Sequence, residues 1–335
     1  MLNLSQNGCS VWVASSTEGL LTPTAVALGK FDGVHLGHQR VIQPVLQSAW
    51  SGENLDHTDG KNPRPYSTVV TFDPHPHEFF TGQPRDLLTP LDEKVAQLRS
   101  LGVEQLVLLP FDRELSALSP EEFVDKILVQ QLQCQQISVG QDFCFGKKRM
   151  GTAQDLQILA AKYNIPVTIV PIKTDTDSFL TTDDTRISTS LIRESLEAGD
   201  IQKANRLLGR PYSLTGVVVA GQKLGRTIGF PTANMQLPKD KFLPRHGVYA
   251  VKVIISDNSP IQQFGVMNIG NRPTVNGIDT RVEVHLLDWS SDLYRKNLVV
   301  QLVKFLRPEQ KFPSLEALKN QIQLDSTAAQ EIFNS

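Results

Sequence analysis

The chain has 335 residues, and 33 lysines and arginines against 35 aspartates and glutamates give it a formal net charge of -2. This length exceeds the ~100–200 residues of a usual domain and predicts two domains. The near-neutral charge argues against a nucleic-acid or membrane-surface partner, and no apolar run approaches the ~18 residues of a membrane span. The three cysteines form no C-x-x-C pair, so neither a disulfide framework nor a structural zinc site is expected, and a reducing cytoplasm fits.

The first part of the chain, up to about Gly209, alternates short apolar runs with helical patterns. Helices are expected after Gly33, with Pro44 as a source of strain, from the capping box at Ser119, and from Thr152. Alternation of this kind predicts an open parallel sheet that has helices on both faces and binds ligands at the carboxyl ends of its strands. The expected strands are Ala25–Leu28, Ser67–Phe72, Gln105–Phe111, Gln136–Gly140 and Pro166–Pro171.

Two segments of this part connect other elements. The stretch Trp50–Tyr66 is rich in Gly, Asn, Asp and Pro without an apolar period, which predicts a mobile surface loop. Ser188–Ala198 and Asp200–Leu208 predict two short helices, each followed by a glycine suited to a C-terminal cap. We expect these helices to form the hinge between the domains.

Beyond Gly209 the sequence becomes rich in valine and in short strand-like runs. Sequential strands without crossover helices predict antiparallel pairing, most simply in a small barrel, and Leu315, Leu318, Ile322 and Leu324 suggest a closing helix. The expected strands are Gly216–Ala220, Gly247–Ile255, Gln263–Ile269, Thr280–Trp289 and Leu298–Leu306.

The stretch Gly29–His38 places glycines and two imidazoles where the first strand gives way to a helix. Glycines allow close approach to an anion, the helix N-terminus offers N–H groups, and His35 and His38 can donate to phosphate oxygens. A turn whose histidines only cap or pack is the alternative. The phosphate site is favoured because Gly29, Phe31, Asp32 and Gly33 surround these histidines.

Two further groups follow strands or open helices in this part. Asp142 is a candidate metal ligand or a turn acceptor, and Phe143 and Phe145 either wall a planar ligand or fill the core. In the run Arg186–Arg193, the hydroxyls of Thr189 and Ser190 bind a phosphate or cap a helix, and Arg193 can pair with the same anion.

In the second part of the chain, glycines, basic residues and polar oxygen donors are concentrated in the run Gly221–Asn234. It is not a Walker loop, but Gly221, Gly225 and Gly229 allow main-chain N–H groups to face a phosphate, and Lys223 and Arg226 supply charge. Thr232 and Asn234 offer neutral oxygens suited to hydrated Mg2+. This pattern suggests a nucleotide site, with a glycine-rich hairpin as the alternative.

Strand alternation along Thr280–Asp288 sends Val282, Val284 and Leu286 to one face and Glu283, with its polar neighbours, to the other. A carboxylate beside a magnesium-bound phosphate can take the proton from an attacking hydroxyl, as phosphoryl transfer to an alcohol requires. A merely solvated strand glutamate is the alternative.

Together these motifs resemble the bacterial bifunctional riboflavin kinase/FAD synthetases over nearly the whole chain. The resemblance implies an α/β plus β fold: a Rossmann-like nucleotidyltransferase domain at 1–205, then a small antiparallel β-barrel kinase domain with a C-terminal helix at 206–335. It implies that the second domain phosphorylates riboflavin with ATP to FMN, and that the first transfers AMP from ATP to FMN, releasing pyrophosphate and FAD. Mg2+ serves both steps, and the partners are the small molecules riboflavin, FMN and ATP.

The resemblance also implies roles for individual residues. In the first domain, His35 and His38 steady the α-phosphate of ATP, and Asp142 lies beside the metal or the flavin phosphate. In the second, Glu283 is the base, Asn268 belongs to a kinase motif that contacts flavin, and Arg307 lies near the flavin or ADP. The remaining ATP-binding residues implied are Arg186, Thr189, Ser190 and Arg193 in the first domain, and Thr232 and Asn234, which take magnesium-ATP, in the second.

Two departures from the family pattern stand out. Thr189 and Ser190 reverse the usual serine-threonine order but keep both hydroxyls. Cys144 replaces a common arginine, which removes a possible contact to the flavin phosphate, for which the nearby basic run 147–149 can compensate. A protein with one active half and a flavin-binding regulator without turnover are the competing hypotheses, and the presence of the candidate catalytic residues weighs against the regulator.

Overall fold

The structure, a computed structural model, describes residues 2–6, 9–17, 19–50, 64–172, 186–221, 225, 228–256, 260–274 and 277–334. The chain divides into two compact units, one made of Met1–Arg85 with Leu91–Ile187, the other of Asp86–Pro90 with Ser188–Ser335. The domain limits 1–205 and 206–335 stay a prediction. The last residue of the first, Asn205, lies inside helix α8 (Ile201–Leu208).

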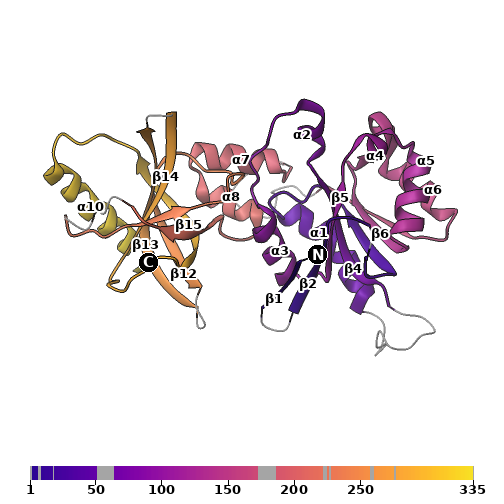
Figure 1. The fold of residues 1–335 in the computed structure, drawn as a ribbon, viewed down its shortest axis with the longest axis horizontal. Helices are drawn as coiled ribbons and strands as arrows, with labels where there is room; N and C mark the ends of the chain where they lie inside the picture. The colour runs from indigo at the N-terminus through magenta and orange to yellow at the C-terminus, as the bar shows by residue number, and fades with distance from the viewer. Residues whose placement is uncertain are drawn as a thin grey trace. The chain divides into compact units, whose positions relative to one another are not determined.

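A seven-stranded sheet with the order β1-β2-β5-β4-β3-β6-β9 forms the centre of the first unit (Figure 1). All neighbouring pairs are parallel except β1 and β2. The five predicted strands are confirmed, whereas β1 and β2 were not predicted, and their antiparallel pairing makes the sheet mixed rather than purely parallel. Strands that follow each other directly in sequence pair antiparallel because a parallel pair needs a long crossover. The strands are β1 (Leu2–Gln6), β2 (Cys9–Ala14), β3 (Thr24–Leu28), β4 (Tyr66–Asp73), β5 (Gln105–Pro110), β6 (Cys134–Gly140) and β9 (Val167–Val170).

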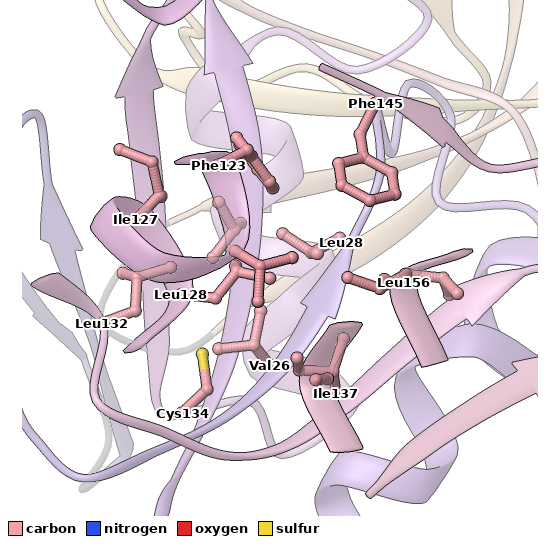
Figure 2. Packing of buried hydrophobic residues seen from close by; sticks show 14 of the residues in the cluster. Val26, Leu28, Phe123, Ile127, Leu128, Leu132, Cys134, Ile137, Phe145 and Leu156 are labelled. Carbon is pink, nitrogen blue, oxygen red and sulfur yellow. The ribbon is translucent and has the colours of Figure 1, made fainter. Parts of the chain in front are cut away.

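Helices cover both faces of this sheet, as predicted. On one face, Val26 and Leu28 of β3 belong to a buried cluster with Phe123, Leu128 and Leu156 (Figure 2). On the other face, Ala25 and Ala27 of β3 belong to a cluster with residues of α1 and α3. The alternation along β3 thus supplies both cores. The helices and the short β7–β8 pair are α1 (Leu36–Trp50), α2 (Pro76–Thr81), α3 (Leu91–Ser100), α4 (Arg113–Ala117), α5 (Pro120–Glu122), the π-helix η1 (Phe123–Gln131), β7 (Cys144–Phe145), η2 (Lys147–Arg149), β8 (Gly151–Thr152) and α6 (Ala153–Ala161).

The predicted helix starts are confirmed in detail. Ser119 caps α5 by accepting from the Glu122 N–H, and Glu122 accepts from the Ser119 N–H in return. Thr152 caps α6 in the same way. Helix α1 runs through Pro44 without a break, because its buried residues Ile42 and Val45 hold it against the sheet despite the missing N–H. The predicted loop after α1 falls largely on 51–63, outside the described residues.

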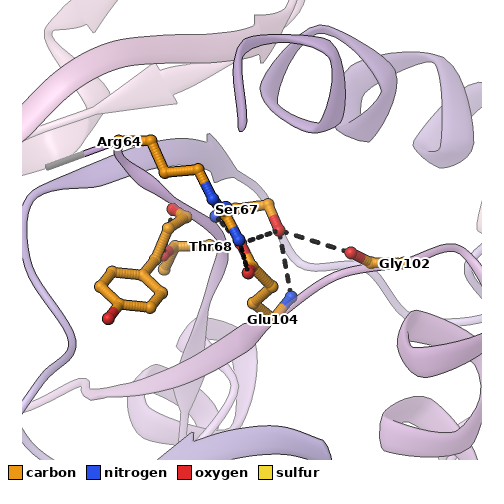
Figure 3. A network of polar contacts seen from close by, with 6 residues as sticks. Arg64, Ser67, Thr68, Gly102 and Glu104 are labelled. Atoms are coloured by element: carbon orange, nitrogen blue, oxygen red, sulfur yellow. Dashed lines mark hydrogen bonds and ion pairs between the residues drawn. The ribbon is translucent and has the colours of Figure 1, made fainter. Parts of the chain in front are cut away.

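A polar network joins the amino ends of β4 and β5 (Figure 3). Arg64 donates to both carboxylate oxygens of Glu104 at 3.0 and 2.7 Å, and Glu104 also accepts from the backbone N–H and hydroxyl of Ser67 at 3.0 and 3.1 Å. The Gly102 carbonyl lies 3.4 Å from Ser67 Oγ and is the alternative acceptor for its single proton. The network fixes the chain where it enters β4.

The second unit contains a closed antiparallel barrel with the order β10-β11-β14-β13-β12-β15 (Figure 1). This confirms the predicted barrel. The short strand β11 was not predicted, because its first two residues belong to the run Gly221–Asn234, whose glycines and polar groups suggested a nucleotide loop. The strands are β10 (Ser213–Val219), β11 (Ala233–Gln236), β12 (Gly247–Ser256), β13 (Ile261–Thr274), β14 (Gly277–Leu286) and β15 (Asn297–Pro308).

In the described part of the second unit, three helices accompany the barrel. Helices α7 (Thr189–Ala198) and α8 end at Gly199 and Gly209, whose φ angles of 82° and 71° confirm the predicted glycine caps. The C-terminal helix α10 (Leu315–Asn334) is also confirmed. Two of the apolar residues that suggested this helix, Leu315 and Leu324, are 65% and 62% exposed.

The packing of α10 uses its later residues. Ala329 is fully buried and belongs to a cluster with Val248, Ala250 and Val266 of the barrel strands. The small Ala329 side chain lets the helix approach these strands closely. Among the described residues, no helix combines the length and apolar character needed to cross a membrane.

Candidate active sites

The turn between β3 and α1 is buried and conformationally constrained. Phe31 and Val34 have φ angles of 48° and 40°, in the left-handed region that such side chains rarely adopt. Both are only 1% exposed, so their burial offsets the backbone cost. The Thr71 hydroxyl donates to the Lys30 carbonyl at 2.9 Å and ties the turn to β4. The turn is therefore held in one shape, as a preorganised site requires.

The two imidazoles of this turn lie against each other, as predicted. The His35 and His38 rings stack with centroids 3.6 Å apart and planes 18° apart. The His38 backbone N–H donates to His35 Nδ1 at 3.3 Å, so a neutral His35 carries its proton on Nε2. A Cβ on Gly37 would lie 3.0 Å from His35 Cε1, so a larger residue there would press on the His35 ring.

Basic groups surround the turn at the carboxyl end of the sheet. The pKa of Lys30 is lowered, first by desolvation and then by repulsion from Arg149 and Arg85. The pKa of His75 is lowered to about 4 by desolvation and by the charges of Lys30 and Arg85, so its ring is neutral near pH 7. Several positively charged side chains held close together would attract a polyphosphate, whose negative charge would relieve their mutual repulsion.

Two predicted site residues meet in an ion pair beside this turn. An Nη2 of Arg186 donates to Oδ2 of Asp142, and both side chains are about half exposed. The carbonyl of Ile187 lies 3.8 Å from where a Cβ on Gly37 would stand, so the Arg186–Ile187 segment passes beside the histidine turn. The structure thus brings Asp142, Arg186 and the histidine turn to the same region of the first unit.

Phe143 and Phe145 stack on each other with ring centroids 5.8 Å apart. Phe145 is 5% exposed and belongs to the hydrophobic core, whereas Phe143 is partly buried at the edge of that core. Core packing therefore accounts for Phe145, and a flavin contact of either ring stays a prediction. Cys144, between them, donates weakly to the Asp142 carbonyl.

Three predicted nucleotide-binding residues lie in the second unit. Thr189 and Ser190 are the first residues of α7, and Ser188 caps this helix by accepting from the Leu191 N–H at 3.2 Å. Arg193 donates to the carbonyl of Asp86, and its guanidinium lies 4.6 Å from the centroid of the Phe242 ring. Their binding to ATP stays a prediction.

An aromatic cluster near the Asp73–Pro76 motif was missed by the sequence analysis. Phe79 packs edge to face on Phe111 with ring centroids 5.3 Å apart, and Phe80 contacts both rings. Phe80 is 70% exposed. Two adjacent phenylalanines directly after a proline-bounded motif were the available signal, because a short helix cannot bury both.

In the second unit, three predicted residues form a row across the barrel wall. Glu283 on β14 is the register partner of Asn234 on β11 and of Asn268 on β13. Residues directly opposite in an antiparallel sheet point to the same face. Val282 and Val284 are buried, which confirms the predicted alternation and places the row on the outer face of the barrel.

The surroundings of Glu283 are polar, as predicted. Its side chain is 32% exposed and lies 4.0 Å from the guanidinium of Arg281. His285, two residues along, contacts the carbonyl of Pro231 through Nδ1 at 2.9 Å and packs edge to face on Phe230. These contacts fix the turn that leads into Asn234.

Glycines bring the predicted nucleotide loop close to this row. A Cβ on Gly221 would lie 2.1 Å from the Asn234 amide, and one on Gly225 would lie 2.3 Å from the Phe230 carbonyl and 3.3 Å from the Thr232 hydroxyl. Gly229 has a φ angle of 88°. Only glycines fit these positions, which explains their spacing. Lys223 and Arg226 lie outside the described residues.

Arg307 pairs with the C-terminal helix. Its guanidinium donates to both carboxylate oxygens of Asp325 at 2.8 to 3.1 Å, and Gln321 donates to the same carboxylate. Asp325 is 5% exposed, so this bidentate pair is largely shielded from water. The geometry accounts for Arg307 as an anchor of α10, and its contact with flavin or ADP stays a prediction.

The first unit has a Rossmann-like sheet with a buried histidine turn, the second has a closed barrel with a polar row on its wall, and the family matches make this a two-domain enzyme of the nucleotide-using transferase class. A family model for FAD synthetase matches residues 18–188, and one for riboflavin kinase matches residues 208–333. The chain belongs to the bifunctional riboflavin kinase/FMN adenylyltransferase family. It is thus an enzyme with an FAD synthetase first half and a riboflavin kinase second half.

Individual relatives agree over the full length. The bifunctional riboflavin kinase/FMN adenylyltransferase of Haemophilus influenzae is 39% identical over 318 residues, 94% of this chain and 96% of the relative. That of Bacillus subtilis is 37% identical over 319 residues, 93% of each chain. A solved structure from Streptococcus pneumoniae, described as a macrolide-efflux protein, has a TM-score of 0.80 at 28% identity and covers 96% of this chain and 98% of its own.

Proposed function

We propose that the Gly29–His38 turn carries adenylyl transfer to FMN and that the row Asn234–Glu283–Asn268 carries phosphorylation of riboflavin. The observation that carries this division is the register of Glu283, which has a predicted ligand on each side. The alternative, that Glu283 is only a solvated strand residue, does not explain why the amides of Asn234 and Asn268 stand opposite it on both sides. The stacked imidazoles of the first unit supply the other centre.

In the kinase step, Glu283 takes the proton from the terminal hydroxyl of riboflavin as the oxygen attacks the γ-phosphorus of ATP. The bond to the β-γ bridging oxygen breaks, and ADP leaves. Asn268 holds the flavin side of the row, and Asn234 the nucleotide side. Gly221 packs its backbone directly against the Asn234 amide, and Gly225 packs against the Phe230 carbonyl, so the glycine loop lies beside the nucleotide side of the row.

Mg2+ fits the oxygen donors at this place. Asn234 brings an amide oxygen opposite Glu283, Thr232 offers a hydroxyl two residues earlier in the chain, and hard cations of this kind prefer oxygen ligands. Bound there, Mg2+ would neutralise charge on the phosphates of ATP. Asp142 is the corresponding carboxylate in the first unit, where Arg186 pairs with it.

In the adenylyl step, a phosphate oxygen of FMN attacks the α-phosphorus of ATP, and the bond to pyrophosphate breaks. This nucleophile is already anionic, so no base is required. His35 and His38 donate to the α-phosphate as charge develops, and the cations Lys30, Arg85 and Arg149 stabilise the pyrophosphate that leaves. Arg186 holds ATP beside the turn.

The aromatic cluster of Phe79, Phe80 and Phe111 supports a flavin contact in the first unit. An exposed ring costs free energy unless a ligand covers it, and flat heteroaromatic rings stack on phenylalanine. We assign the isoalloxazine of FMN to this cluster together with Phe143. Riboflavin, FMN and ATP are the small-molecule partners, and the cytoplasm, where ATP is abundant, is the proposed location.

Incubation of the purified protein with riboflavin, ATP and Mg2+, followed by separation of the flavins over time, tests the proposal. FMN should appear first and FAD should follow. Formation of FMN alone would indicate that only the kinase half is active. Flavin binding without either product would indicate a regulator and overturn the enzymatic assignment.

A further inference from the structure

A short segment of the first half is built into the second unit. Residues Asp86–Pro90, here called the strap, belong to the compact unit that otherwise begins at Ser188. The chain therefore enters the second unit at Asp86, returns to the first at Leu91, and enters the second again at Ser188. The two units are joined by three chain crossings rather than by one linker.

Backbone hydrogen bonds fix the strap within the second unit. The Leu87 N–H donates to the Asp240 carbonyl at 2.6 Å, and the Phe242 N–H donates to the Leu87 carbonyl at 2.9 Å. Leu87 and Lys241 form a parallel β-bridge. Leu88 is fully buried. The strap is thus held like a strand of this unit and not like a surface loop.

Two cationic side chains add to this hold. Lys241 is 4% exposed, its Nζ donates to the Leu88 carbonyl at 2.7 Å, and it lies 4.4 Å from the centroid of the Tyr212 ring. Arg193 donates to the Asp86 carbonyl. A buried ammonium is costly unless it is well bonded, so the Lys241 contact is specific to this conformation of the strap.

The residues before the strap belong to the adenylyl-transfer side. The Arg85 N–H donates to Glu78 Oε1 at 2.8 Å, and the other carboxylate oxygen accepts from the His75 N–H at 3.1 Å. These bonds close the α2 loop, defined as residues 74–85. Arg85, whose N–H makes the last hydrogen bond of this loop, is joined by one peptide bond to Asp86, whose carbonyl accepts from Arg193. No unbonded residue lies between the loop and the strap that could absorb a movement of either.

We propose that Lys241, which lies in the kinase-bearing unit, is a positioning residue for adenylyl transfer. By holding the strap it fixes the conformation of the α2 loop, which carries Arg85, His75 and the α2 phenylalanines 79 and 80, the second of them exposed. Lys241 itself touches no reacting group. The inference rests on the proposed assignment of adenylyl transfer to the first unit.

Lys241→Met in the full-length protein tests this proposal, because methionine keeps the apolar stem and removes the ammonium. We expect kcat/KM for FMN-to-FAD conversion to fall about tenfold, since small displacements of positioned groups are costly. Riboflavin phosphorylation should stay within about twofold. Lys239→Met, an exposed lysine two residues away, is the matched control and should change neither rate.

Hydrogen–deuterium exchange supplies a readout independent of activity. In Lys241→Met the amides of Leu87 and of Arg85 should both exchange faster, because the first is bonded in the strap and the second in the α2 loop. Faster exchange at Leu87 with unchanged Arg85 exchange and unchanged FAD synthesis would overturn the proposal. If the wild type makes no FAD, the proposed function fails, while the Arg85 exchange still reports whether the strap acts on the loop.

A second variant covers the case in which Lys241→Met does not fold. Two glycines inserted between Arg85 and Asp86 leave every strap contact possible and add slack before it. The insertion should slow FAD synthesis as Lys241→Met does, with normal riboflavin phosphorylation and normal exchange at Leu87. Normal FAD synthesis by this insertion variant would overturn the proposal.

Discussion

Asn234 and Glu283 lie directly opposite each other on neighbouring antiparallel strands of the barrel. Their side chains share the outer face, and Gly221 leaves the Asn234 amide accessible to a close backbone approach. A carboxylate held beside a neutral amide in this way can accept a proton while the amide keeps its contact with a phosphate or its counter-ion. This pair concentrates the kinase chemistry at one point of the barrel wall.

Glu283→Gln should therefore abolish most of the kinase activity. The change removes the base and keeps the shape, so kcat for riboflavin phosphorylation should fall about 10²- to 10⁴-fold. FMN-to-FAD conversion should continue at the wild-type rate, measured with FMN supplied directly. Glu316→Gln, at an exposed position of α10, is the matched charge control. Loss of both activities in a folded Glu283→Gln protein would contradict the division between the units.

His38→Ala should have the opposite effect. Removing one of two stacked imidazoles takes away a donor to the transferred phosphate, so adenylyl transfer should slow about 10²- to 10³-fold. Riboflavin phosphorylation should be unchanged, because Glu283 and its row lie in the other unit. Lys162→Ala, at an exposed position at the end of α6 in the same unit, is the control. Equal FAD production by His38→Ala and the wild type, with FMN supplied, would remove His38 from the mechanism.

The sequence predicts which face a side chain takes and where a turn lies, but it does not predict which distant residues pair with each other across the sheet. Alternation along β14 identifies Glu283 as outward-facing because side chains alternate every residue. The register that sets Glu283 between Asn234 and Asn268 joins positions far apart in sequence, and no local pattern encodes that pairing. The strap shows the same limit, since Leu87 pairs with Lys241 across most of the first unit's sequence.

Leu315 and Leu324 illustrate a second limit. Both are among the apolar residues that predicted this helix, but both are exposed, and the small Ala329 is the residue that packs fully buried against the barrel strands. Helical patterns report which residues lie on one side of a helix and not how deep the neighbouring surface is. Exposed leucines are common on folded proteins for this reason.

Glu104→Gln should destabilise the first unit, with a defined pH dependence. Burial alone would raise the pKa of Glu104, but hydrogen bonds from Arg64 and Ser67 outweigh it and lower the pKa below the ordinary 4.5. A carboxyl with a depressed folded pKa stabilises the fold above its unfolded pKa, and this contribution is lost as pH falls through the folded value.

The loss in Glu104→Gln should be about 1–3 kcal/mol near pH 7, measured as the free energy of unfolding in urea. The difference from the wild type should shrink once the pH falls below 4.5, where the unfolded chain takes up the Glu104 proton before the folded protein does. Glu114→Gln, at an exposed position of α4, serves as the control for loss of one charge. A difference that stays constant from pH 7 to pH 3 would contradict the ion-paired Glu104.

His75→Asn should flatten the pH dependence of stability in the weakly acidic range. His75 has a folded pKa of about 4 against an ordinary value of 6.5, so the unfolded chain takes up a proton first as the pH falls. A lowered histidine pKa therefore costs stability progressively between those two values. Asparagine cannot titrate and is a good N-cap, so it can replace the acceptor that His75 Nδ1 presents to the His77 N–H.

The melting temperatures of variant and wild type should be similar near pH 7.5, and that of the variant should fall less on going to pH 5, as followed by scanning calorimetry. If the melting temperatures of variant and wild type fell equally between pH 7.5 and pH 5, His75 would have the same pKa in the folded and the unfolded chain. That result would contradict the desolvated site flanked by cations.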